Sequence, residues 1–299
     1  MKLITFTDPD GVTRPGVVRG EEAVAIQAVG SVREVFERGA EGMDAARSAD
    51  GPTFALADVR LRAPIMPKKL IHTSGNFREH EEESKNVNWS HEIAPWIVFF
   101  QNVDAIIGPD DPIIYPEHLT TELDHELELA VVMAKDGAFL SPEEAGEYIG
   151  GYLIFNDITA RDIQRREMIS GVFSFCKSID TFCPIGPWIV TPDEIGDDRT
   201  LSMELRVNGE PRQKSFSGNM SVTLPELISH HSPLRYSAGD VVTTGTVSGV
   251  AGFKDDAQKW YLKPGDVMEC EIDRIGILRN PVISWQDGHG SPAPAFRSW

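Results

Sequence analysis

Three carboxylates lie in or directly after two apolar, strand-like segments. Those segments could bring the three side chains together at one site. Glu126 and Glu128 are two residues apart in the apolar run 126–132, and on an extended chain such residues project to the same face. Asp157 directly follows a second apolar run, residues 152–156. Burying carboxylates together without a counter-ion is costly, and an all-oxygen site is the kind that Mg²⁺, Mn²⁺ or Ca²⁺ prefers over Zn²⁺. The pattern therefore predicts a divalent-metal site.

A histidine and a glutamate three residues apart form a candidate general base. On a helical turn His80 and Glu83 face each other, so the carboxylate could hold the imidazole while it takes a proton from water. The same pair lies in the acidic run 79–83, which is at least as typical of a solvated helix face. The residues alone leave both interpretations open.

Lys177 is a lone cation inside the apolar stretch 173–178. It could extend to solvent, or it could point inward and neutralise a substrate carboxylate or a developing oxyanion. Residues 244–252 form a Gly-bearing loop that could bind an anion through backbone N–H groups or could be a plain turn. The chain has no P-loop, dinucleotide fingerprint, GxSxG or HExxH motif, which removes the commonest serine hydrolase and zinc protease interpretations.

The elements that must position these side chains are mostly strands. Apolar strand candidates alternate with Gly, Pro and Asp turns from about residue 66 to 283, and helical patterns are fewer, at about 31–48, 141–148, 160–170 and 224–230. This favours a mixed, mainly β, α+β core over a doubly wound sheet. We expect a small N-terminal α/β module over residues 1–65, a catalytic domain over 66–283, and a C-terminal tail over 284–299.

Composition narrows the class of partner. The 299-residue chain has 46 acidic and 28 basic residues and a formal net charge of -18, which argues against a nucleic-acid or anionic-lipid partner. No apolar run approaches the ~20 residues of a membrane span. The turn at residues 8–11 comes too early for a signal peptide, so we expect a cytoplasmic protein. Three cysteines without a CxxC pair indicate reduced, buried thiols: Cys176, Cys183 and Cys270.

Together these segments resemble the fumarylacetoacetate hydrolase family over roughly residues 66–283. Five motifs stand in the family's order: Gly75-Asn76-Phe77 with His80, residues 125–132, residues 156–164, residues 177–187, and Thr244-Gly245-Thr246. The resemblance implies a mixed β-roll or sandwich core, usually homodimeric, with Mg²⁺ or Mn²⁺ bound by Glu126, Glu128 and Asp157. It also implies that His80 and Glu83 activate water.

The resemblance extends to further site residues. Arg161, Gln164, Lys177 and Thr246 fall on positions that in the family meet the substrate or support the site, although Arg161 could instead only brace the metal loop. Residues 81–95, with Trp89, His91 and the neighbouring Trp96, would form a lid over the site.

Two departures from the family pattern stand out. Gln101 occupies a strand position where many members have Lys, and Val247 stands where Pro is frequent. The change at Gln101 replaces a positive group beside the substrate with a neutral amide, which could weaken binding of a second carboxylate or oxyanion.

These inferences predict a metal-dependent hydrolase that cleaves a carbon–carbon bond in a 1,3-dicarbonyl substrate, an acylpyruvate or related 2,4-dioxo acid from aromatic or sugar-acid catabolism. Lys177 and Gln101 would orient that substrate. One alternative keeps the metal–enolate site but performs decarboxylation, isomerisation or dehydration of a 2-oxo acid. An alternative of another class is a non-catalytic, metal-stabilised scaffold or binder.

Overall fold

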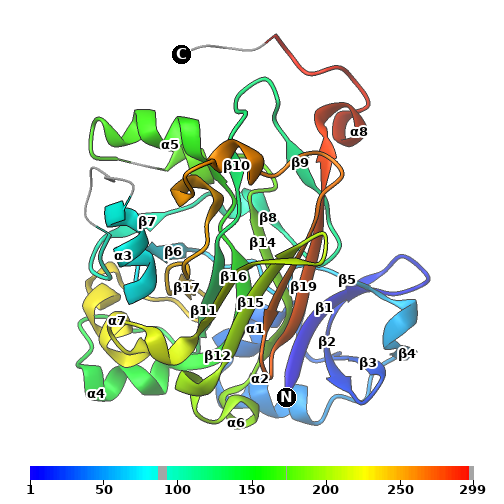
Figure 1. The fold of residues 1–299 in the computed structure, drawn as a ribbon. Coiled ribbons are helices and arrows are strands. Elements are labelled where there is room, and N and C mark those ends of the chain that lie inside the picture. Colours follow the sequence, from blue (N-terminus) through cyan, green and yellow to red (C-terminus); the bar gives the residue numbers. More distant parts are fainter. Residues whose placement is uncertain (87–92, 173, 296–299) are drawn as a thin grey trace.

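The computed structural model describes residues 1–86, 93–172 and 174–295, and Figure 1 shows its fold. Residues 87–92, which include Trp89 and His91 of the expected lid, lie outside the described residues. Strands predominate over helices, which confirms the α+β, mainly β fold class. No helix in the described part of the chain is long and apolar enough to cross a membrane.

The elements have the following bounds. The strands are β1 (Lys2–Thr7), β2 (Thr13–Arg19), β3 (Glu22–Ala25), β4 (Thr53–Ala55), β5 (Arg60–Leu61), β6 (Leu70–Thr73), β7 (Val98–Phe100), β8 (Ile106–Ile107), β9 (Ile113–Tyr115), β10 (Leu123–Asp124), β11 (Leu127–Met133), β12 (Ile149–Asn156), β13 (Thr159–Ala160), β14 (Cys183–Val190), β15 (Ser202–Val207), β16 (Glu210–Phe216), β17 (Val241–Thr243), β18 (Val267–Ile272) and β19 (Gly276–Ser284). The helices are α1 (Val32–Glu37), α2 (Ala40–Arg47), α3 (Arg78–Asn86), α4 (Pro142–Ala145), α5 (Arg161–Met168), α6 (Pro192–Ile195), α7 (Leu224–His231) and α8 (Trp285–His289).

The main sheet of the described residues has the strand order β4-β3-β2-β1-β14-β12-β11-β17-β6-β7, and β5 and β8 pair off this path. A second sheet has the order β16-β15-β18-β19-β9. The centre of the main sheet is buried on both faces, since every residue of β11 is buried. Such a strand must be covered on both sides.

Two hydrophobic clusters provide that cover, and alternate residues of β11 enter each one. Leu127, Leu129 and Val131 belong to the cluster shared with the second sheet, whereas Ala130 and Val132 belong to the cluster that α1 and α2 close on the opposite face. Glu126 and Glu128 continue the even-numbered series. The alternation of the strand therefore places both carboxylates on one face, at the end where β11 begins.

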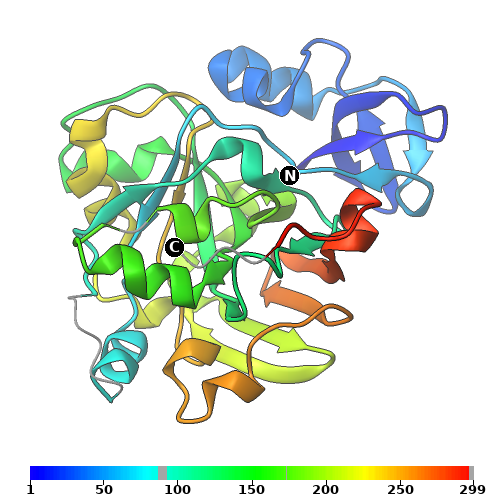
Figure 2. The ribbon, with the colours of Figure 1, turned by 90° about the horizontal axis from the view of Figure 1, so that it is seen from above.

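The N-terminal strands continue the main sheet. Antiparallel pairing of β1 with β14 joins Lys2 to Val190 and Leu3 to Ile189. Figure 2 shows this blue N-terminal part at one side of the molecule. The sheet thus runs across the expected boundary at residue 65, and the division into domains stays a prediction.

The helical stretch expected at residues 31–48 is two helices. Gly39 has a φ of 56° between α1 and α2, a left-handed conformation that an α-helix cannot continue through. Helix α7 begins, by contrast, at a complete capping box in which Thr223 and Glu226 satisfy each other's backbone N–H groups. After β19, the expected tail begins with the short helix α8.

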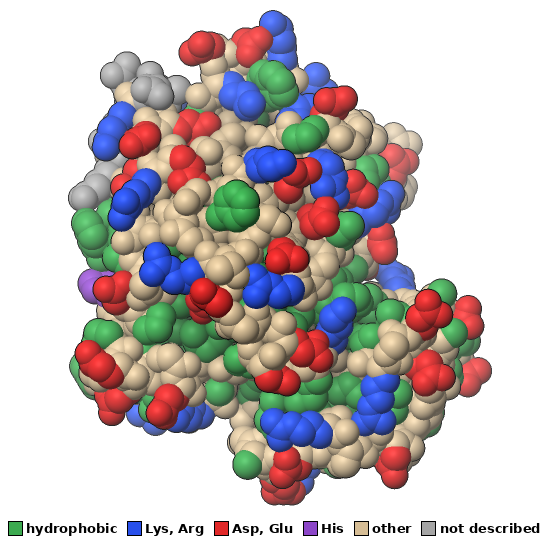
Figure 3. All heavy atoms as spheres, turned by 60° about the horizontal axis from the view of Figure 1, so that its bottom comes forward, with side chains coloured by type: hydrophobic (Ala, Val, Ile, Leu, Met, Phe, Trp, Pro, Cys, Tyr) green, Lys and Arg blue, Asp and Glu red, His purple; other side chains and the backbone are tan. Residues whose placement is uncertain are grey.

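The surface is consistent with the charge balance of the sequence. On the face drawn in Figure 3, lysine and arginine side chains are interspersed with aspartate and glutamate rather than gathered into one positive patch.

Candidate active site

The three carboxylates converge where β11 begins and β12 ends. Antiparallel pairing sets Leu127 opposite Asn156, and the Asp157 N–H donates to the Glu126 carbonyl at 2.8 Å, so Asp157 reaches the strand that carries both glutamates. One carboxylate oxygen from each of Glu126, Glu128 and Asp157 lies within 4.8 Å of the others, and all three side chains are buried. The two separated sequence segments therefore build one acidic cluster.

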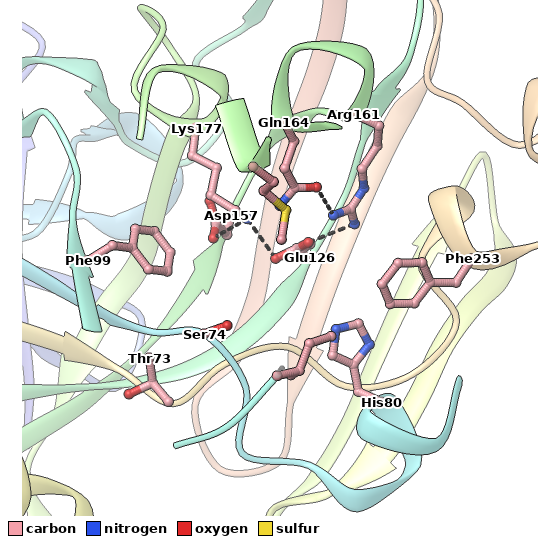
Figure 4. Close-up of a pocket in the computed structure, with 12 residues that line it drawn as sticks. Thr73, Ser74, His80, Phe99, Glu126, Asp157, Arg161, Gln164, Lys177 and Phe253 are labelled. Carbon is pink, nitrogen blue, oxygen red and sulfur yellow. Dashed lines mark hydrogen bonds and ion pairs between the residues drawn. The ribbon is translucent and has the colours of Figure 1, made fainter. Parts of the chain in front are cut away.

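Lys177 points into this cluster rather than to solvent. Its Nζ donates to Glu126 Oε2 at 2.9 Å, to Asp157 Oδ2 at 2.6 Å and to Thr159 Oγ1 at 2.7 Å. Figure 4 shows the ammonium group beside both carboxylates. Lys177 therefore points into the protein interior and does not extend to solvent.

Arg161 contacts the same cluster from the other side. Its Nη2 lies 2.6 Å from Glu126 Oε1, its Nε donates to Asp124 Oδ2 at 2.7 Å, and its Nη1 donates to Gln164 Oε1 at 2.9 Å. Asp124 also accepts the backbone N–H groups of Ala251 and Gly252. The guanidinium is therefore held rigidly between a buried aspartate and the acidic cluster.

Burial and mutual repulsion shift the carboxylate pKa values in different directions. Burial and then the neighbouring Asp157 and Glu126 raise the pKa of Glu128 well above its ordinary value. Burial also raises the pKa of Asp157 to about 6, although Lys177 opposes this rise. For Glu126, burial is outweighed by Lys177 and Arg161, and its pKa is lowered. Burial opposes the charge of Lys177, but Asp157 and Glu126 prevail and raise its pKa.

The charge of the cluster fits a divalent cation. Four buried carboxylates, those of Asp124, Glu126, Glu128 and Asp157, meet two buried cations, Lys177 and Arg161. Two negative charges remain when all the carboxylates are ionised. An all-carboxylate donor set with that surplus suits Mg²⁺ or Mn²⁺ rather than Zn²⁺.

His80 and Glu83 pair on helix α3 as their spacing predicts. His80 Nδ1 lies 3.3 Å from Glu83 Oε2, and both Glu83 oxygens accept the Gly249 N–H at 3.1 Å. The imidazole stacks on Phe253 with ring centroids 5.1 Å apart. With Nδ1–H donating to Glu83, the lone pair of the neutral ring is on Nε2.

The acidic run around this pair is not a freely solvated face. Glu79 accepts a hydrogen bond from the Ser215 hydroxyl, and Glu81 accepts one from Ser221 at 3.0 Å. Together with Glu83, these contacts attach α3 to β16 and to two loops. The hydrogen bonds of Glu79, Glu81 and Glu83 therefore fix the orientation of the helix that carries His80.

A pocket separates His80 from the carboxylates. The free space inside it is about 30 Å³, and Figure 4 shows His80 and Phe253 opposite Asp157 and Lys177, with Glu126 between them. The described residues that line it are Thr73, Ser74, His80, Ile93, Phe99, Glu126, Asp157, Arg161, Gln164, Met168, Lys177 and Phe253. The pocket therefore lies between a candidate base and the acidic cluster, with room for about one or two water molecules.

Two predicted substrate-binding residues, Gln101 and Thr246, are absent from this lining, and of the two only Gln101 contacts a carboxylate of the cluster. Gln101 Nε2 donates to Asp157 Oδ1 at 2.5 Å, and its Oε1 accepts from the Cys183 thiol. Thr246 donates to the Leu127 carbonyl at 3.0 Å and accepts from Gln213. Their contacts are with protein groups, so their roles toward substrate stay predictions.

Sequence reasoning missed several residues that orient the site. The Glu167 carboxylate accepts the backbone N–H groups of residues 174–176, which fixes the turn that carries Lys177. Phe253 supports the His80 ring, and Asp124 anchors Arg161. Asp124 adjoins the carboxylate motif in the sequence, but nothing there marks Glu167 or Phe253.

Comparisons with known proteins agree with this geometry. A family model described as fumarylacetoacetate (FAA) hydrolase C-terminal matches residues 69–283. The 2,4-didehydro-3-deoxy-L-rhamnonate hydrolase of a Sphingomonas strain is 35% identical over 277 residues, 90% of this chain and 94% of the relative. Oxaloacetate tautomerase YisK of Bacillus subtilis is 38% identical over 232 residues, covering 77% and 75%. The structure of maleylpyruvate hydrolase from Sphingobium sp. SYK-6, in complex with manganese(II) and pyruvate, has a TM-score of 0.75 and 27% identity, covering 95% and 99%.

Proposed function

The chain belongs to the fumarylacetoacetate hydrolase family, and from this premise we propose that it is a divalent-metal-dependent hydrolase of a 2,4-dioxo acid. The observation that supports hydrolysis most directly is the His80–Glu83 pair, which faces the acidic cluster across the pocket. A base in this position can activate a water molecule against a substrate whose oxygens lie at the cluster. The Sphingomonas relative, whose match spans 90% of this chain, acts, by its name, as a hydrolase of a didehydro-deoxy sugar acid.

In this proposal Glu126, Glu128 and Asp157 hold Mg²⁺ or Mn²⁺. When bound, the ion supplies Lewis-acid stabilisation of negative charge on the oxygens of the 2-oxo acid portion. Lys177 and Arg161 keep Asp157 and Glu126 ionised and fixed in direction. Gln101 orients Asp157 through its amide.

The reaction balances with water as the only co-substrate. His80 Nε2 takes a proton from water, and the hydroxide adds to the C4 carbonyl while Glu83 stabilises the imidazolium. The C3–C4 bond then breaks, its electron pair passes to the pyruvate portion as an enolate, and the imidazolium returns the proton to C3. The products are a carboxylic acid and pyruvate, and Gln164 and Thr246 are proposed to support substrate placement.

The test is a panel of acylpyruvates, sugar-derived 2,4-dioxo acids, oxaloacetate and simple 2-oxo acids, incubated with Mg²⁺, Mn²⁺ or EDTA, with products identified by mass. We expect metal-dependent pyruvate release from at least one 2,4-dioxo acid. His80→Asn should lower kcat by about 10²–10⁴-fold, the usual contribution of a general base. His230→Asn, a change at an exposed histidine of α7, is the matched control.

Turnover by Asp157→Ala without added metal would refute the proposal. Metal-dependent CO₂ release instead of pyruvate release would indicate the decarboxylase alternative. Metal binding without turnover of any compound in the panel would support the alternative of a non-catalytic, metal-stabilised binder.

Oxaloacetate tautomerisation is a second candidate, because a 38% identical relative carries that name. This reaction moves a proton between carbon and oxygen and needs no attacking water. The two candidates therefore separate in the same panel: a tautomerase interconverts keto and enol oxaloacetate without changing its mass, whereas the hydrolase splits its substrate into two acids.

A further inference from the structure

Leu127 separates two of the three carboxylates of the acidic cluster, so the path of its backbone sets how Glu126 and Glu128 are directed. The strand ladder supports this residue on one side only. Antiparallel pairing with β12 places Leu127 opposite Asn156, whereas β17 pairs with β11 only at residues 130–132. The buried beginning of β11 therefore needs other hydrogen-bond partners on the side of β17.

Two side chains supply those partners. Gln213 Oε1 accepts the Leu127 N–H at 2.9 Å, and the Thr246 hydroxyl donates to the Leu127 carbonyl at 3.0 Å. Gln213 Nε2 in turn donates to the same hydroxyl at 3.0 Å. The three residues form a closed ring of hydrogen bonds, in which an amide and a hydroxyl take the place of a neighbouring strand.

The ring permits one placement of its protons. The Leu127 N–H can only donate and its carbonyl can only accept, so the glutamine oxygen must face the N–H and the threonine proton must go to the carbonyl. Gln213 Nε2 also donates to the Val247 carbonyl at 2.7 Å, and its Oε1 lies 3.1 Å from His125 Nδ1. Each polar atom of the amide thus has two partners, and turning the amide over would set like groups against each other.

Gln213 reaches this position from the second sheet. It lies on β16, the edge strand of that sheet, opposite Leu205 of β15. Burial alternates along the strand, with Gln213 and Ser215 buried and Lys214 and Phe216 exposed. The glutamine side chain therefore points inward and joins the second sheet to the end of β11 that carries the glutamates.

Packing alone does not require an amide at this position. Leu127 and Leu205 belong to the apolar core, where a methionine of similar length would fill the same space. A buried amide is costly unless it is hydrogen-bonded, and Gln213 is 1% exposed. What the amide adds is the set of four bonds, and these go to the segment before Glu128 and to the Thr246 loop.

We propose that Gln213 is a positioning residue that holds the backbone between Glu126 and Glu128 and so fixes the direction of both carboxylates for binding a divalent cation. This inference rests on the metal site of the proposed function. Gln213 acts through Leu127 and Thr246 rather than on the ion or the substrate. Partners behind a metal ligand typically contribute about 10–100-fold in metal affinity. We expect the lower end of that range, because Gln213 bonds the backbone and not the carboxylates.

The experiment measures Mn²⁺ affinity by the electron paramagnetic resonance signal of free Mn²⁺ during titration of the full chain. Gln213→Met keeps the length of the side chain but removes its hydrogen bonds, and Thr246→Val removes the hydroxyl of the ring. Asn280→Leu is the matched control, because Asn280 is also a buried amide and its Nδ2 donates to the Gly108 and Asp111 carbonyls at 2.9 Å, outside the cluster. Thermal unfolding in EDTA reports whether each variant folds without metal.

We expect Gln213→Met to raise the Mn²⁺ dissociation constant by about 10-fold, and Asn280→Leu to keep the wild-type value although it also loses stability. Thr246→Val should weaken binding by a similar factor. The double variant of Gln213 and Thr246 should bind no more weakly than the weaker single variant, because both changes open the same ring. A merely structural role of Gln213 would lower the Tm as Asn280→Leu does, without a change in Mn²⁺ affinity.

Folded Gln213→Met protein with wild-type Mn²⁺ affinity, an equal loss of affinity in Asn280→Leu, or additive losses in the double variant would overturn the inference and leave the proposed function intact. If Gln213→Met does not fold in EDTA, Thr246→Val decides by the same comparison with Asn280→Leu, because it removes the bond to the Leu127 carbonyl. Absence of Mn²⁺ binding by the wild-type chain would overturn the proposed function and this inference together.

Discussion

Replacing Lys177 by methionine should show that this side chain is the internal counter-ion of the acidic cluster. Its ammonium group is buried and lies 2.6 Å from Asp157 and 2.9 Å from Glu126. Methionine keeps much of the volume but leaves these carboxylates facing each other without that charge. Removing one partner of a buried ion pair typically costs 3–5 kcal/mol, so we expect a loss of about 4 kcal/mol in the metal-free protein.

The assay is thermal unfolding at pH 8 in EDTA and again with saturating Mn²⁺. A loss of about 4 kcal/mol corresponds to a fall in Tm of roughly 6 °C for a chain of this size. Lys259→Met is the matched control, because Lys259 and its partner Asp256 have side-chain exposures of 77% and 51%. Such an exposed pair contributes at most about 1 kcal/mol.

Mn²⁺ should reduce the difference in Tm between Lys177→Met and the wild type. A doubly charged ion neutralises the same carboxylates and stabilises the folded state that binds it. The reasoning would be refuted if both lysine variants lost equal stability in EDTA. It would also be refuted if the difference between Lys177→Met and the wild type were the same with and without the ion.

Two further predictions concern stability. Burial lowers the pKa of His231 from 6.5 to about 4, so its stabilising contribution is complete above pH 6.5 and is lost as the pH falls toward 4. This pKa shift corresponds to about 3 kcal/mol of unfolding free energy. In denaturant unfolding between pH 4 and 7, the unfolding free energy of His231→Gln should fall less with decreasing pH than that of His230→Gln. Equal pH dependence of the two variants would contradict this prediction. Gly245→Ala should cost about 2–4 kcal/mol in the same assay, because Gly245 has a φ of +80° and its added Cβ would lie 2.8 Å from Gly75 Cα. Gly265→Ala, with a φ of +99° and nothing within 4 Å, should cost only about 1 kcal/mol, and equal losses would show that the contact is relieved without cost.

The sequence by itself placed the chemistry that depends on short spacings. Side chains two apart on a strand share a face, so Glu126 and Glu128 had to project together once residues 127–133 formed β11. Residues three apart on a helix are neighbours, so His80 and Glu83 could meet on α3. Composition and the dominance of short apolar runs gave the fold class for the same reason, since both are local properties of the chain.

Other features depended on which distant segments became neighbours. The apolar residues around Lys177 were compatible with either solvent or interior, and only the turn held by Glu167 directs the ammonium group to Glu126 and Asp157. The break at Gly39 was likewise not apparent from the apolar periodicity, because it depends on one backbone dihedral.

Only the tertiary structure could decide which distant polar groups become neighbours. His72 and Thr243 are 171 residues apart, and they meet because β6 and β17 pair in parallel in the main sheet. A single sequence carries no local signal for such a pairing, since the register is set by burial across the whole sheet. Spacing therefore decides which charges can share a face, and sheet register decides which distant groups neutralise or orient them.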